Sequence, residues 1–181
     1  MFPLFRKKDG PAVTDQVWMT VQAKFSALAD RLRQDPSLVL VGWFEQTLEQ
    51  FRQFPGTGTL TPDGALRMAE DPALSGGLNA TLLFLEHHPL PGRERALWDQ
   101  LGLSRVTVCS ALDEPLFVHF GGEKITQVLK KMGLPDNEMV QNPLIGSAIR
   151  GVQDKIASQV LVETPSRSQQ QWIENNLRKA E

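Results

Sequence analysis

Hydrophobic residues recur with two different spacings along the 181-residue chain, and together these spacings predict its fold class. Residues 38–41, 82–85 and 106–109 are almost entirely apolar, as expected for strands covered on both faces of a parallel sheet. Between these runs, apolar residues return every three or four positions, which is typical of helices that bury one face. Strands alternating with helices predict an α/β fold, and we expect the three strands to be parallel neighbours in one sheet.

The helical spacing also predicts where the helices begin and end. They are expected over residues 14–33, 44–54, 93–101, 114–131, 143–161 and 166–179. Thr14 or Asp15 is expected to cap the first helix, and Asp113 and Glu114 to cap and begin the fourth. The region 56–77 is punctuated by glycine and proline and predicts at most one short helix, near residues 64–70. We therefore expect a disordered lead, an α/β domain and a C-terminal helix, at residues 1–13, 14–164 and 165–181.

The helix predicted over residues 143–161 carries a continuous apolar stripe that needs a cover. The stripe consists of Ile145, Ile149, Val152, Ile156 and Val160. Its exposure would cost several kcal/mol, at about 25 cal/mol for each Å² of apolar surface. Because Pro165 permits a sharp reversal, we expect the last helix to fold back and to cover the stripe with its own apolar residues, Trp172, Ile173 and Leu177. Apolar surface that stays exposed would serve association with another protein.

Composition and charge restrict the class of protein. With 41% hydrophobic residues the chain can bury one full core, and its net charge of −2 gives no electrostatic reason to bind nucleic acid or an anionic membrane. No apolar run approaches the roughly 20 residues of a membrane span, and the basic residues near the start follow a short apolar tip, the wrong order for a secretory signal. Cys109 lies in an apolar run and is expected to be a buried thiol. We expect a cytoplasmic protein with no membrane span and no nucleic-acid partner.

Residues 110–156 contain a series of short motifs in a recognisable order. They read SALDEPLFVHFGGEKITQVLKKMGLPDNEMVQNPLIGSAIRGVQDKI. The series resembles the end of the second nucleotide-binding domain of SecA, the motor ATPase of bacterial protein export. Weaker likenesses in the same order lie at residues 17–25, 38–42, 76–78 and 86–88. The positions that carry the main resemblance are Ser110, Leu112, Asp113, Phe120, Gly121, Gly122, Lys124, Ile125, Met132, Gly133, Pro135, Ala148, Ile149, Gln153 and Lys155.

The resemblance implies the fold of a motor domain without the chemistry of the motor. It implies a reduced RecA-like α/β domain, in which a parallel sheet is flanked by helices and followed by a helical C-terminal extension. A nucleotide-hydrolysing motor needs a glycine-rich phosphate loop that is followed by lysine, and the GTGT stretch at residues 56–59 has no such lysine. The arginine run of the SecA domain is reduced to Arg93 and Arg95. We therefore expect no ATPase activity and no cofactor.

Polar residues that follow the strand predicted at 79–86 form the candidate ligand site. Open α/β sheets place ligands at the carboxyl ends of their strands. Adjacent strand residues point to opposite sides, so the two neighbouring histidines here are not expected to share a metal ion. The plainer interpretation is that the histidines are hydrogen-bonded by their neighbours and that the arginines are solvated. The candidate residues are Glu86, His87, His88, Arg93 and Arg95.

Two classes of function remain open. The leading interpretation is a non-catalytic SecA-like module that acts by binding another protein in export, with the partner unidentified and homo-oligomerisation as a further option. The alternative is a regulator or enzyme that binds a small ligand or a nucleotide near His87 and Arg93. Because fold does not determine function, the resemblance is also compatible with an unrelated activity. Binding of nucleotides or divalent metals would distinguish the first two classes.

Overall fold

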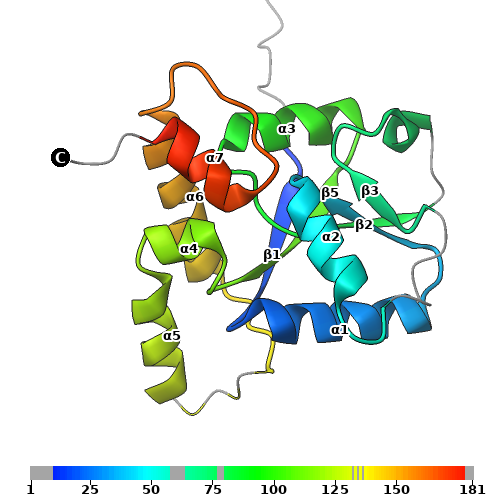
Figure 1. Ribbon diagram of the computed structural model, residues 1–181, viewed down its shortest axis with the longest axis horizontal. Helices are drawn as coiled ribbons and strands as arrows, with labels where there is room; N and C mark the ends of the chain where they lie inside the picture. The colour runs from blue at the N-terminus through cyan, green and yellow to red at the C-terminus, as the bar shows by residue number, and fades with distance from the viewer. Residues whose placement is uncertain are drawn as a thin grey trace, which may run out of the picture.

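The computed structural model describes residues 10–57, 64–76, 80–131, 133, 135 and 137–177. Within these residues one sheet is formed by β1 (Ala12–Trp18), β2 (Leu38–Gly42), β3 (Leu66–Met68), β4 (Thr81–Phe84) and β5 (Arg105–Ala111). The strand order is β1-β5-β4-β2-β3, and every pairing is parallel (Figure 1). The three strands expected from their apolar runs are therefore neighbours, and the predicted α/β fold with a parallel sheet is confirmed.

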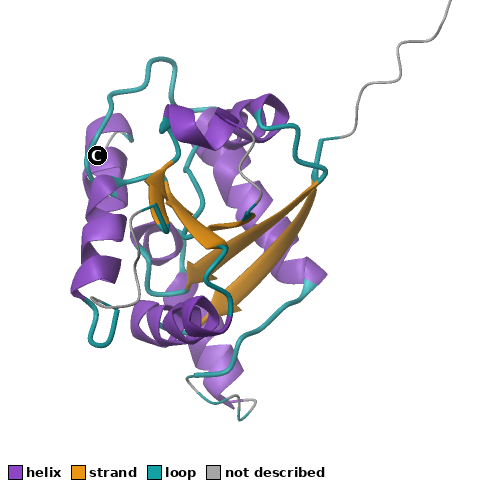
Figure 2. Ribbon diagram, turned by 90° about the vertical axis from the view of Figure 1, so that its right-hand side faces the viewer, coloured by secondary structure: helices purple, strands orange, loops and turns teal. Residues whose placement is uncertain are grey.

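Helices cover both faces of the sheet, which explains the continuous apolar runs (Figure 2). Alternate residues of β2 enter two different clusters. Leu38 and Leu40 pack with residues of α1 (Val21–Gln34) and α2 (Glu45–Gln53) on one face. Val39 and Val41 pack on the other face with Trp98 of α3 (Pro91–Gln100) and with Leu74 of the 3₁₀ turn η1 (Pro72–Gly76). A strand buried on both sides needs an apolar residue at every position.

The helix predicted over residues 14–33 is wrong in its first part. Residues of β1 pair with β5 along their whole length, and α1 begins only at Val21. The helix is capped by Thr20, whose Oγ1 accepts a hydrogen bond from the Ala23 N–H at 3.1 Å. The four-residue step from Val17 to Val21 fits a helix, but pairing with β5 overrides that local spacing. The lead expected at residues 1–13 falls mostly on residues 1–9, which lie outside the described residues.

Two further predictions need correction. The short helix expected near residues 64–70 is wrong, because this region forms the edge strand β3, followed by η1. The helix expected at 114–131 is divided into α4 (Pro115–His119) and α5 (Gly122–Lys131). Gly121, with φ of +89°, lies between them in a backbone conformation that other residues rarely adopt.

The C-terminal region folds back but covers only part of the predicted stripe, because Ile145 and Ile149 pack in a different cluster with residues of β1 and α4. Helix α6 (Pro143–Ala157) lies along β1, and α7 (Gln169–Asn176) packs against α4 (Figure 1). Trp172, Ile173 and Leu177 form one buried cluster with Ile156 of the predicted stripe. Gly146 permits the approach of α6 to β1, because a Cβ atom at this position would overlap the Asp15 carboxylate. Among the described helices, none combines the length and the apolar content of a bilayer span.

Candidate functional site

The chain connections create a crevice between β2 and β4. These neighbouring strands lead to helices on opposite faces of the sheet, since α2 packs on one face and α3 on the other. In open α/β sheets such a switch point, at the carboxyl ends of the strands, is where ligands bind. Here it is surrounded by polar side chains that are 9% exposed or less: Asp15, Lys24, Glu86, His87, His88, Glu94, Glu114, Gln153 and Gln169.

Glu86 occupies the position at the start of α2 that suits an anion. One of its carboxylate oxygens accepts hydrogen bonds from the backbone N–H groups of Trp43 and Phe44, both at 3.2 Å. The other oxygen accepts the Thr47 hydroxyl at 2.7 Å. A further amide of this helix terminus, the Gln46 N–H, bonds to the Arg167 carbonyl oxygen at 3.0 Å. Three of the amides that could hold a phosphate group at this helix terminus, those of Trp43, Phe44 and Gln46, are therefore already used.

Burial and the charge of Glu114 raise the pKa of Glu86 to about 7, against the lowering effect of Lys24 and of the hydrogen bonds. Glu86 therefore lies between its protonated and ionised forms near neutral pH.

His87 is a buried cation held between two carboxylates. Its Nε2 lies 2.9 Å from Asp15 Oδ1, and its Nδ1 lies 2.8 Å from Glu94 Oε1. Ionised carboxylates only accept hydrogen bonds, so both ring nitrogens carry a proton. Burial by itself lowers the pKa of His87, but the charges and hydrogen bonds of Glu94 and Asp15 outweigh it and raise the pKa to about 10.

His88 is in the opposite protonation state. Its Nδ1 accepts the Leu90 N–H at 3.0 Å and is therefore unprotonated. Its ring stacks on Phe44 at an interplanar angle of 12°, and Trp43 and Trp172 contact it edge-on. Burial is the main cause that lowers the pKa of His88 to about 4, so the ring is neutral near pH 7. The adjacent histidines thus face different partners, as the sequence predicted.

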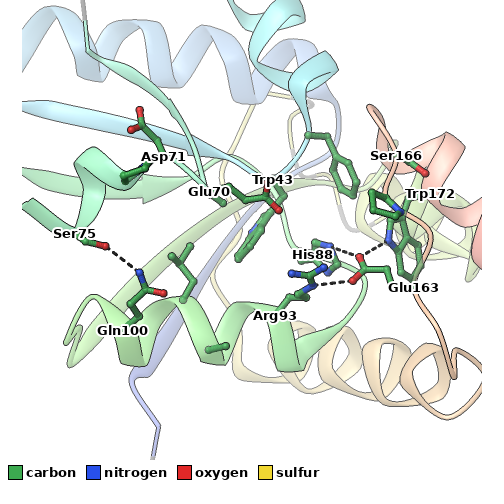
Figure 3. A pocket seen from close by; sticks show the side chains of 16 residues that line it. Trp43, Glu70, Asp71, Ser75, His88, Arg93, Gln100, Glu163, Ser166 and Trp172 are labelled. Atoms are coloured by element: carbon green, nitrogen blue, oxygen red, sulfur yellow. Dashed lines mark hydrogen bonds and ion pairs between the residues drawn. The ribbon is translucent and has the colours of Figure 1, made fainter.

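Glu163 belongs to the segment between α6 and α7, and its side chain points into the crevice toward His88 and Arg93 (Figure 3). Its carboxylate accepts the Trp172 Nε1–H at 2.8 Å and the Arg93 Nε–H at 2.7 Å, and it lies 3.3 Å from His88 Nε2. Gln169 adds a second attachment, because its side chain accepts the Leu116 N–H and donates to the His87 carbonyl oxygen. The chain's own C-terminal region therefore forms part of the lining of the crevice, on the side of α3.

The five residues predicted as one ligand site line three separate cavities. His88 and Arg93 line a cavity of about 420 Å³, shown in Figure 3. Glu86 lines a second cavity of about 520 Å³, between α1 and α2. His87 and Arg95 line a third cavity, of about 230 Å³. The structure thus places the predicted residues near one another without making a single site of them.

Lys24 and Glu114 form a buried ion pair that was not predicted from the sequence. The Lys24 ammonium is paired with Glu114 Oε1 and donates to the Leu85 carbonyl oxygen at 2.6 Å. The expected cap at residue 113 is also different, because Asp113 Oδ1 accepts the Val21 N–H of α1 at 2.7 Å instead of capping α4. One signal was available: Lys24 follows Val21 by three positions and precedes Leu28 by four, so it lies on the apolar stripe of α1.

The remaining candidates are a reactive cysteine and a metal centre. Cys109 is fully buried, as expected, and burial raises the pKa of its thiol to about 11, which suppresses the reactive thiolate. Within the described ranges, no group of three or more His, Cys, Asp or Glu residues is arranged to hold a metal ion.

No model of a protein family matches the chain, and no curated protein matches it either.

Proposed function

We propose that the protein is a non-catalytic module of SecA-like architecture that acts in protein export by binding another protein. The observation that carries the proposal is that both anion positions of the crevice hold carboxylates of the chain itself. Glu86 occupies the backbone amides at the start of α2, and Glu163 occupies Arg93 and Trp172. A nucleotide phosphate at either position would have to displace the carboxylate there, and Glu86 would be left buried without its partners, which is strongly unfavourable.

A contact surface lies next to this crevice. In the segment that leads to Glu163, Leu161 is 97% exposed and Val162 is 84% exposed. Single exposed apolar residues are common, but two in succession beside an anchored carboxylate support a role in contacting a protein. Apolar side chains at the centre of an interface commonly carry much of its binding energy.

An export assay tests the proposal. Cells that lack the protein should process a signal-bearing precursor more slowly in a pulse–chase experiment, and the wild-type protein should restore the rate. The double variant Leu161→Ser/Val162→Ser should fail to restore it at equal protein level. Leu144→Ser, which changes a 77% exposed residue on α6, should restore it fully and is the matched control. Normal processing in cells that lack the protein would overturn the role in export.

A second candidate function rests on the cavity shown in Figure 3. Trp43 lines this cavity, and its buried Nε1–H has no acceptor within the described residues. A small ligand with an acceptor group would satisfy that donor and contact Arg93, as expected of a regulator. Thermal shift measurements with ATP, ADP and divalent metals distinguish the two candidates. A nucleotide-dependent stabilisation that Arg93→Ala removes would favour the regulator.

A further inference from the structure

Glu86, which bonds to the backbone amides of Trp43 and Phe44 in the crevice, also lines the cavity between α1 and α2. Its volume of about 520 Å³ falls within the usual range of small-ligand sites. The cavity opens at the carboxyl ends of β4 and β5, and side-chain amides, among them Gln46 and Gln50, form part of its exposed lining. We call it the α1–α2 cleft.

The α1–α2 cleft has more negative than positive charge. Three carboxylates line it, those of Glu86, Asp113 and Glu114, and the one cationic group among its lining residues is the Lys24 ammonium. That ammonium is already committed to Glu114 Oε1 and to the Leu85 carbonyl oxygen. Burial raises the pKa of both Glu86 and Glu114, because it disfavours their ionised forms.

One acceptor beside the cleft has no donor. The second carboxylate oxygen of Glu114, Oε2, is buried and receives no hydrogen bond from the described part of the chain. Buried polar atoms are nearly always paired, so an orphan acceptor beside a cavity indicates a donor that the chain does not supply. An anion would be repelled here, and a neutral ligand would leave the excess negative charge uncompensated.

We propose that the α1–α2 cleft binds a cationic nitrogen group, either an alkylammonium or a guanidinium. Its N–H donors would reach the carboxylates of Glu114 and Asp113 after a local adjustment of side chains. Its methylene groups would lie against apolar lining residues such as Val21 and Phe54. The group belongs to a lysine or arginine side chain of a partner protein or to a free polyamine. The site is built from this chain alone and does not depend on a role in export.

Isothermal titration of the full chain tests the proposal. The probes are the blocked peptides acetyl-Gly-Lys-Gly-amide and acetyl-Gly-Arg-Gly-amide and the free amine spermidine, at constant ionic strength. The glutamine peptide acetyl-Gly-Gln-Gly-amide is the neutral control. Saturable binding of a cationic probe without binding of the glutamine peptide is expected. Binding of the peptides alone assigns the site to a partner side chain, and binding of spermidine alone assigns it to a free amine.

Two matched substitutions locate the binding. Gln50→Lys places a competing ammonium on the exposed lining of the cleft and should weaken binding by roughly tenfold or more. Gln159→Lys makes the same change at an exposed residue outside the cleft and should leave the affinity unchanged. Both positions are exposed, so both variants should fold. No saturable binding up to about 10 mM, or equal weakening by the two substitutions, would overturn the proposal.

Discussion

The buried imidazolium of His87 makes a sharp prediction about stability. In the variant His87→Gln, Asp15 and Glu94 lose the cation that lies 2.9 and 2.8 Å from them. Removing one partner of a buried charge pair typically costs about 3–5 kcal/mol. The rise of the His87 pKa from 6.5 to about 10 gives a similar figure, roughly 5 kcal/mol, at about 1.4 kcal/mol for each pH unit. For a chain of this length, 3–5 kcal/mol lowers the Tm by roughly 6–20 °C.

The raised pKa of His87 makes the folded protein less stable as the pH rises. Below pH 6.5 both folded and unfolded states carry the proton on His87, so its stabilisation is fully present. Between pH 6.5 and about 10 the unfolded state loses the proton while the folded state keeps it, so stability falls as pH rises. In the window from pH 7 to 9 the His87 contribution is the difference between the slope of the wild type and that of a variant without His87, because folded Glu86 still titrates near pH 7 and unfolded Cys109 titrates near pH 9.

Urea unfolding at pH 7, 8 and 9 measures this effect. The wild-type free energy of unfolding should fall by up to about 1.4 kcal/mol for each pH unit. His119→Gln changes an exposed histidine at the end of α4 and should retain both the stability and the slope, within about 0.5 kcal/mol. His87→Gln should lose the His87 contribution to the slope. A wild-type stability that is constant from pH 7 to 9 would refute the assignment of a buried imidazolium, even if the variant failed to fold.

Three further predictions follow from the packing. Gly146→Ala should destabilise the protein by about 1–3 kcal/mol in urea unfolding, because the new methyl group would overlap the Asp15 carboxylate, whereas Gly151→Ala on the same helix meets no neighbouring atom and should not. Truncation after Thr164 removes Trp172 and its cluster, so self-association in light scattering or a large loss of Tm is expected, and a monomer with unchanged melting would contradict it. The Cys109 thiol should react with a thiol reagent at pH 8 only after unfolding, and rapid reaction of the native protein would disprove its burial.

The central part of the fold was predictable because burial on both faces leaves a local signal. Leu38, Leu40 and their neighbours must all be apolar, so β2 is visible from the sequence alone. The first strand was not predictable in the same way. Asp15, which bonds to His87, interrupts the apolar pattern of this strand. In addition, the four-residue step from Val17 to Val21 matches the spacing of a helix.

The candidate site was predictable only in part, since its partners are distant along the chain. The position of Glu86, His87 and His88 at a strand end follows from the sequence. Their partners do not: Asp15 lies 72 positions from His87, and Lys24 lies 90 positions from Glu114. Such pairs are set by the order of strands in the sheet, which the runs of apolar residues do not reveal.

An ATP hydrolysis assay tests the central claim most directly, namely that the module is non-catalytic because its own carboxylates occupy the anion positions of the crevice. Phosphate release by the purified full chain, with magnesium present, should equal that of a buffer blank. The double variant Arg93→Ala/Arg95→Ala and the control Arg105→Ala, which changes an exposed residue at the amino end of β5, should give the same result. Turnover above the blank that is abolished by the double variant and kept by Arg105→Ala would contradict the account.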